Sequence, residues 1–263
     1  MKKLLKTSGI LGILTIFVLI CFGCSKNVEM VRPATAEEAM DLFNKYNLEN
    51  NVEEMVKLYS NEYIEYLGYD ANQIIKVMKK NRKELNIKSS TTKSIEDINE
   101  NLKKAVVTIS AVVDGNDTAE DYVYAIIKED NGWAVSPDGI TECIDFDVPM
   151  DKEKEFNLNL VKEAVQFDGA LIRVNLYNGS GNSYVFGTSD EKTEIVVETT
   201  EGTFKSVVEE PQKIDKKARS YFIAKIQDLK GDITKVTVTS LFELDKDGNP
   251  IVDTKQDITA YSK

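Results

Sequence analysis

The chain has 263 residues, three cysteines and no histidine, and its 44 acidic against 33 basic side chains give a formal charge of −11. Without histidine, a Ser-His-Asp or Cys-His catalytic arrangement and a histidine-ligated zinc site are excluded. The acidic balance argues against nucleic-acid binding, and three cysteines are too few to staple a fold of this size with disulfides.

The N-terminus has the layout of an export signal. Three lysines within the first six residues precede an apolar stretch over 10–22. This stretch is shorter than the roughly 20 apolar residues that span a bilayer, and no Ala-x-Ala cleavage site follows it. The stretch runs into Gly23-Cys24, and here the sequence resembles a lipoprotein signal of Gram-positive bacteria, in which a small residue precedes a lipidated cysteine.

This resemblance implies a signal peptide over 1–23 and a diacylglycerol anchor on Cys24. The alternative is an uncleaved N-terminal anchor. Either interpretation places the rest of the chain on the extracytoplasmic face of the cell membrane, tethered through its N-terminus, with residues 24–34 as a polar tether.

Helix-capping signals and apolar residues at helical spacing then predict three helices. The capping signals are Thr35-x-x-Glu38, Asn51-x-x-Glu54 and Asp70-x-x-Gln73. After Asn86 the pattern changes to a period of two, which is typical of strands. The expected strands lie near 87–98, 104–114, 118–129 and 132–136, with hairpin turns at Asp114-Gly115 and Asn131-Gly132. Residues 35–137 are therefore expected to form an α+β domain with its helices packed on an antiparallel sheet.

The order of these elements resembles the nuclear-transport-factor-2-like fold, also called the cystatin-like cone. The resemblance rests on paired helices that end in Val56-Lys-Leu-Tyr59 and on a final hairpin from Tyr122 to Val135. It implies a sheet that curves around the helices and can leave an apolar pocket.

An acidic segment without sustained periodicity, 138–155, is expected to link this domain to a second one. Residues 156–263 read as all-β, because short alternating runs are separated by turn residues. The runs lie near 156–167, 170–178, 183–188, 193–200, 203–209, 219–227, 233–244 and 251–261. The architecture resembles the immunoglobulin-like sandwiches of Gram-positive lipoproteins, although the Cys-Trp-Cys core of antibody domains is missing.

For three further features, we prefer an ordinary structural interpretation to a functional one. The segment Glu243–Asn249 resembles part of a calcium loop, but it lies between strand-like runs and is expected to be a hairpin turn. The basic run formed by Lys76, Lys79, Lys80, Arg82, Lys83 and Lys88 could meet an anionic partner, but it is expected to be the solvated face of a helix. Cys143 is interpreted as a core residue.

Aromatic residues supply the candidate binding site. The candidates are Tyr59, Tyr63, Tyr122, Tyr124 and Trp133. In a cone fold they could line a pocket that offers flat apolar surface and hydroxyl groups to a ligand, or they could simply fill the core.

The sequence leaves two functional hypotheses open. The first is a non-catalytic, membrane-anchored module that binds a protein, a peptide or another envelope component. The second is a protein that binds, or slowly transforms by acid–base chemistry, a small apolar molecule in the aromatic pocket. We expect no catalytic triad, metal or cofactor, and no nucleic-acid partner.

Overall fold

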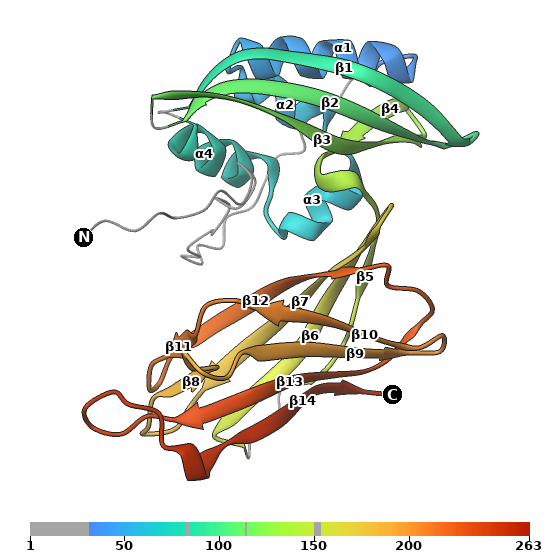
Figure 1. Ribbon diagram of the computed structural model, residues 1–263. Coiled ribbons are helices and arrows are strands. Elements are labelled where there is room, and N and C mark those ends of the chain that lie inside the picture. The colour runs from blue at the N-terminus through green and yellow to red at the C-terminus, as the bar shows by residue number, and fades with distance from the viewer. Residues whose placement is uncertain (1–31, 83–84, 114, 150–153) are drawn as a thin grey trace. The chain divides into compact units, whose positions relative to one another are not determined.

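The computed structural model describes residues 32–82, 85–113, 115–149 and 154–263 (Figure 1). The chain divides into two compact units, the first ending at Ile140 and the second beginning at Thr141. The expected signal peptide and Cys24 lie outside the described residues. Among the helices in the described part of the chain, none has both the length and the apolar character needed to cross a membrane.

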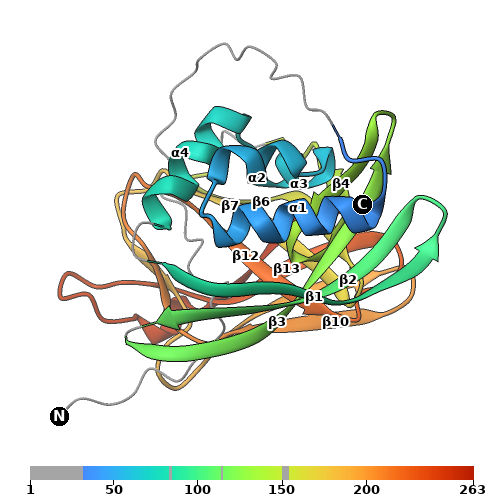
Figure 2. The ribbon, with the colours of Figure 1, turned by 90° about the horizontal axis from the view of Figure 1, so that it is seen from above.

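The first unit combines helices with one antiparallel sheet. Its helices are α1 (Ala36–Leu48), α2 (Val52–Leu58), α3 (Asn61–Leu67) and α4 (Ala71–Asn81). Its strands are β1 (Asn86–Asn99), β2 (Leu102–Val113), β3 (Asn116–Glu129) and β4 (Gly132–Ser136), hydrogen-bonded in that order. Figures 1 and 2 show α1 lying along one face of this sheet. The predicted combination of helices with an antiparallel sheet is confirmed.

The helices begin where side chains accept hydrogen bonds from free backbone amides. The three expected caps are present: Thr35, Asn51 and Asp70 each accept a bond from the amide three residues later. Asp70 forms a full capping box with Gln73. The capping signals of the sequence do not predict α3, which begins where the Ser60 hydroxyl accepts a hydrogen bond from the Tyr63 amide.

A polar network fixes α1 on the sheet. Asn44 Nδ2 donates to Thr92 Oγ1 at 2.7 Å, and Asn47 Nδ2 donates to Ser90 Oγ at 3.1 Å. The Ser90 hydroxyl in turn donates to Asn44 Oδ1 at 2.8 Å. Because these amides are buried and satisfied, they hold the helix in one rotation about its axis.

The second unit contains two antiparallel sheets. One has the order β12-β7-β6-β5, and the other has the order β10-β9-β13-β8-β11, with β14 also paired to β13. The strands are β5 (Ile140–Asp145), β6 (Phe156–Gln166), β7 (Gly169–Asn178), β8 (Tyr184–Phe186), β9 (Thr193–Thr199), β10 (Thr203–Val208), β11 (Gln212–Ile214), β12 (Arg219–Gln227), β13 (Ile233–Glu243) and β14 (Gln256–Ser262). Buried side chains of both sheets form one hydrophobic cluster, with Leu160 and Ile172 from one sheet and Ile195 and Val238 from the other.

The structure differs from the expected strands in three places. The acidic segment expected as a connector carries β5 at its start, and β11 was not predicted. The last strand begins at Gln256 rather than near 251, because a short 3-10 turn occupies Val252–Thr254. The segment Glu243–Asn249, which resembles part of a calcium loop, forms a turn. In this turn the Asp245 carboxylate accepts hydrogen bonds from the backbone amides of Asp247 and Asn249.

Candidate ligand-binding cavity

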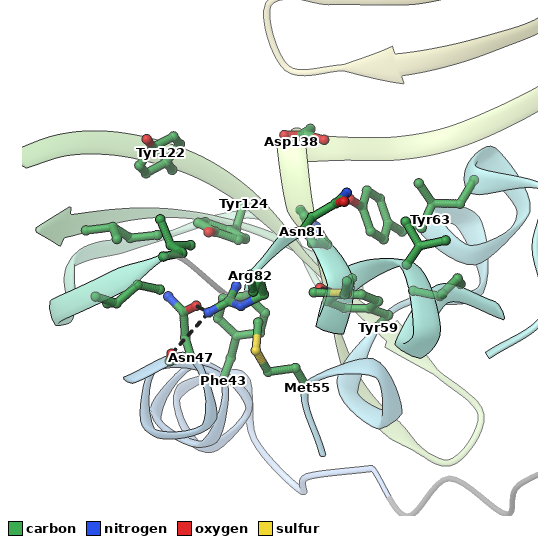
Figure 3. Close-up of a pocket in the computed structure, with 18 of the residues that line it drawn as sticks. Phe43, Asn47, Met55, Tyr59, Tyr63, Asn81, Arg82, Tyr122, Tyr124 and Asp138 are labelled. Atoms are coloured by element: carbon green, nitrogen blue, oxygen red, sulfur yellow. Dashed lines mark hydrogen bonds between the residues drawn. The ribbon is translucent and has the colours of Figure 1, made fainter. Parts of the chain in front are cut away.

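A cavity of about 230 Å³ lies within the first unit (Figure 3). Side chains from all four helices, the first three strands and the turn after β4 line it. These are Phe43, Asn47, Met55, Tyr59, Tyr63, Leu67, Tyr69, Ile74, Val77, Met78, Asn81, Arg82, Leu85, Ile87, Ile109, Ala111, Tyr122, Tyr124, Pro137 and Asp138. The wall is mostly apolar, as is usual for sites that bind small molecules.

Packed aromatic rings form one part of the wall. The rings of Tyr59 and Tyr63 meet edge to face with their centroids 5.0 Å apart. Phe43 lies 5.2 Å from Tyr124 and 6.3 Å from Tyr59, measured between ring centroids. All four side chains are buried. Such contacts hold the rings in fixed orientations, so this part of the wall is preformed.

The backbone explains why these rings converge. Tyr59 ends α2 with an extended conformation and forms a bridge to Val135 of β4. Tyr63 follows one turn later on α3, and Tyr124 projects from β3 opposite Ala105 of β2. The small Ala105 side chain leaves room for the large ring beside it, on the face that carries the helices.

The tyrosine hydroxyls stay protonated and can donate hydrogen bonds. Burial raises the pKa of Tyr59, Tyr63 and Tyr124 above the ordinary tyrosine value. The negative charge of Asp138 raises all three further. Tyr59 Oη already donates to Met78 Sδ at 3.4 Å, a weak acceptor that a better one could replace.

Asp138 occupies an unusual backbone conformation beside the cavity. In the turn Pro137–Gly139 it adopts φ 62° and ψ 9°, the left-handed region that residues other than glycine rarely enter. Aspartate tolerates this region better than most residues, and such strain often marks functional positions. The turn brings the Asp138 carboxyl close enough to the tyrosines for its charge to act on their hydroxyls.

Arg82 supplies the positive charge of the wall. It caps the C-terminal end of α4, and its Nε donates to Asn50 Oδ1 at 2.9 Å. Its Nη2 donates to Asn47 Oδ1 at 2.7 Å and to the Asn47 carbonyl oxygen at 3.2 Å. Figure 3 shows the guanidinium beside Asn47, with Asp138 at another side of the cavity. Burial lowers the pKa of Arg82, but arginine remains charged in proteins.

Four of the five aromatic candidates lie on this cavity. Tyr59, Tyr63, Tyr122 and Tyr124 line it, although Tyr122 is half-buried and donates its hydroxyl to Glu120. Trp133 does not line it. Its ring lies 5.6 Å from the Lys103 ammonium, and its backbone amide donates to the Pro33 carbonyl.

Arg82 and Asp138 are not among the site residues that the sequence predicts. The sequence pattern places Arg82 with the lysines on the solvated face of a helix and Asp138 in the acidic connector. Arg82 follows the last residue of α4, Asn81, but the apolar pattern of the sequence continues to Leu85, so no local signal marks that Arg82 leaves the solvated face.

The cavity is suited to binding a small molecule with an apolar body and one or two polar groups. In the described ranges, no group of three or more cysteine, aspartate or glutamate side chains is placed to hold a metal ion. Comparison of the sequence with known protein families and with curated proteins finds no match in either. The geometry of the cavity therefore carries the functional argument alone.

Proposed function

We propose that the first unit binds a small, predominantly apolar molecule in its aromatic cavity. The observation that supports this most directly is the space itself. A domain whose aromatic residues simply filled the space between helices and sheet would leave no pocket of this volume there, since side chains in protein interiors pack closely. Among the two hypotheses from the sequence, the cavity favours small-molecule binding. The interaction-module hypothesis rests on the sequence resemblances alone.

We further propose the cone-type fold for the first unit and the immunoglobulin-like architecture for the second. Helices on one face of a meander β1-β2-β3-β4 support the former. Two antiparallel sheets around one hydrophobic cluster support the latter. We also propose attachment to the extracytoplasmic face of the membrane through Cys24, which the residues around Gly23-Cys24 support.

Filling the cavity tests the binding proposal. Ala111 on β2 is buried and lines the cavity, so Ala111→Leu would place three further carbons in open space. We expect the free energy of unfolding to stay within about 1 kcal/mol of that of the parent protein, while stabilisation by bound small molecules is lost. A screen of small apolar compounds by thermal shift, run on both proteins, measures the two effects.

Ala105→Leu is the matched control. Ala105 lies on the same strand, is equally buried and does not line the cavity. There the added carbons have no space, so we expect a loss of about 1–3 kcal/mol. Equal destabilisation by both substitutions would show that the cavity is absent in solution. Unchanged ligand binding by Ala111→Leu would place the ligand elsewhere.

The anchor has its own test. Cys24→Ala is expected to abolish metabolic labelling with a radioactive fatty acid and to move the protein from the membrane fraction to the medium. Cys21→Ala serves as the control and should leave both readouts unchanged. Label that persists in Cys24→Ala, or that disappears only in Cys21→Ala, would contradict the assignment of the lipid to Cys24.

A further inference from the structure

The cavity contains a positive charge that no carboxylate of the described residues pairs with. Among the described residues, Arg82 is the cation of the wall, and every acceptor that they offer to its hydrogen bonds is an uncharged amide or carbonyl oxygen. Within the described part of the chain, no carboxylate lies within ion-pair distance of its guanidinium. A charge that is partly removed from water normally gains an opposite charge in compensation.

The two asparagines orient this guanidinium instead of neutralising it. They accept hydrogen bonds from Nε and Nη2, while Nη1 makes none with the described residues. Asn47 is itself fixed because its Nδ2 donates to Ser90 on β1. The planar group is thus held in one position at low entropic cost, which is the preorganisation that a binding site for an anion requires.

Asp138 places a negative charge on another part of the wall than the positive charge of Arg82. It acts on the hydroxyls of Tyr59, Tyr63 and Tyr124, whereas the charge of Arg82 acts on Tyr59 and Tyr124. Figure 3 shows Arg82 next to Asn47, whereas Asp138 and Tyr63 lie away from Asn47. A negative group of a ligand would be repelled at Asp138 and attracted at Arg82, so the cavity imposes a direction on the ligand.

The volume limits the size of the ligand. At about 230 Å³ the cavity is larger than the ~150 Å³ cavity that accommodates benzene. It is too small to enclose the whole of a long acyl chain. One ring or a short branched chain, with a polar group attached, matches this space.

We propose that the ligand is a small apolar carboxylic acid, whose carboxylate pairs with Arg82 and whose apolar body packs against Phe43, Tyr59 and Tyr124. This inference rests on the proposed function and specifies its ligand class. A carboxylate can accept from Nη1 and form a charge-assisted hydrogen bond, which is stronger than a bond between neutral groups.

Matched acid and amide probes test the proposal on the full chain. Suitable pairs are 3-phenylpropionate with 3-phenylpropionamide and 4-methylpentanoate with 4-methylpentanamide, titrated at pH 7 by calorimetry. We expect each acid to bind about tenfold or more tightly than its amide, since a hydrogen bond to a charged partner is worth that factor. In Arg82→Met this preference should disappear while amide binding is retained.

Two further variants separate recognition from folding. Arg82→Lys keeps the charge without the planar fork and should retain part of the preference. Lys80→Met removes a charge from the exposed side of the same helix and should leave the preference unchanged. Equal affinity of the parent protein for acid and amide would overturn the proposal and leave the cavity as a site for neutral molecules. If no probe of either kind binds, the proposed function fails together with it.

Discussion

Replacing Arg32 with methionine is expected to lower the free energy of unfolding of the first unit by about 3–5 kcal/mol, the usual loss when one partner of a buried ion pair is removed. Arg32 Nη2 donates to Glu129 Oε2 at 2.9 Å, with only 1% and 13% of the two side chains exposed. Arg32 Nη1 donates to the Lys57 carbonyl at 2.8 Å. Among the described residues, the substitution would leave the Glu129 carboxylate with one remaining partner, the Asn61 amide at 2.7 Å.

The surrounding backbone leaves little room for relaxation. Gly132 has φ +126°, and a Cβ at this position would lie 2.5 Å from the Pro33 carbonyl oxygen and 2.7 Å from Arg32 Cβ. The segment that carries Arg32 is therefore pressed against the start of β4, where the Trp133 amide donates to the Pro33 carbonyl at 2.9 Å. Because α2, α3 and β3 all meet at this ion pair, its loss should affect the whole unit.

Trp133 is the single tryptophan of the chain, so urea unfolding followed by its fluorescence reports on the first unit. Lys93→Met is the control, because the Lys93–Asp121 ion pair has a length of 2.7 Å but half-exposed side chains. Exposed pairs contribute about 0–1 kcal/mol.

The double variant Arg32→Met/Glu129→Gln should recover part of the lost stability, since it no longer buries an uncompensated carboxylate. If Arg32→Met costs no more than Lys93→Met, the buried pair does not hold the unit together.

Local signals predicted most elements of the first unit because neighbouring residues determine them. The hydroxyl or carboxylate of Thr35 or Asp70 is a few bonds away from the amides that it caps. Likewise, a Gly at the turn selects the hairpin between β3 and β4. The same reasoning missed α3, whose third position carries Tyr63 instead of a capping-box glutamate. Ser60 before it and Gly68 after it, at φ +68°, were the signals available.

The polar groups of the cavity depend on contacts between distant segments, which periodicity does not encode. On a helical wheel Arg82 continues the row of exposed lysines of α4. The helix ends at Asn81, however, so Arg82 is released from that row and reaches Asn47 on α1. Asp138 lines the cavity from the turn after β4, in which it takes a left-handed conformation. The sequence could thus predict the tyrosines of the wall but neither of its charges.

The acidic segment was misread for a related reason. Strand β5 (ITECID) is short, polar and paired on one edge only, with β6. It is a strand mainly because its backbone pairs with β6. The alternation of apolar and polar residues within its six residues is too weak to detect in the sequence. Cys143 on this strand is half-exposed rather than buried, with its sulfur 3.8 Å from Lys162 Nζ.

The stability of the second unit is expected to decrease as the pH rises from about 5 to 8. Glu163 lies on β6 opposite the core residue Ile172, with 7% of its surface exposed. Burial raises its pKa from 4.5 to about 7, and the negative charges of Glu142 and Asp232 contribute to this shift. The folded state therefore holds a proton that the unfolded chain releases at lower pH.

The direction in which stability changes with pH follows from this difference between the folded and unfolded pKa. A group whose folded pKa lies above its unfolded pKa stabilises the fold fully below the unfolded value, and the contribution is lost as the pH passes the folded value. For Glu163 the window runs from 4.5 to about 7. The size of the effect is on the order of 3–4 kcal/mol, because the pKa rises from 4.5 to about 7 and one pKa unit corresponds to about 1.4 kcal/mol.

Glu163→Gln keeps the shape of the protonated side chain and cannot ionise. This variant is expected to unfold with little dependence on pH across the window and to exceed the parent protein in stability at pH 8. Far-UV circular dichroism during urea unfolding measures the transition of the second unit, and Trp133 fluorescence distinguishes that of the first. Glu201→Gln, the same chemical change at an exposed turn, should preserve the parent slope. A parent protein whose second unit is as stable at pH 8 as at pH 5 would show that Glu163 ionises freely, which would require water to reach it between the sheets.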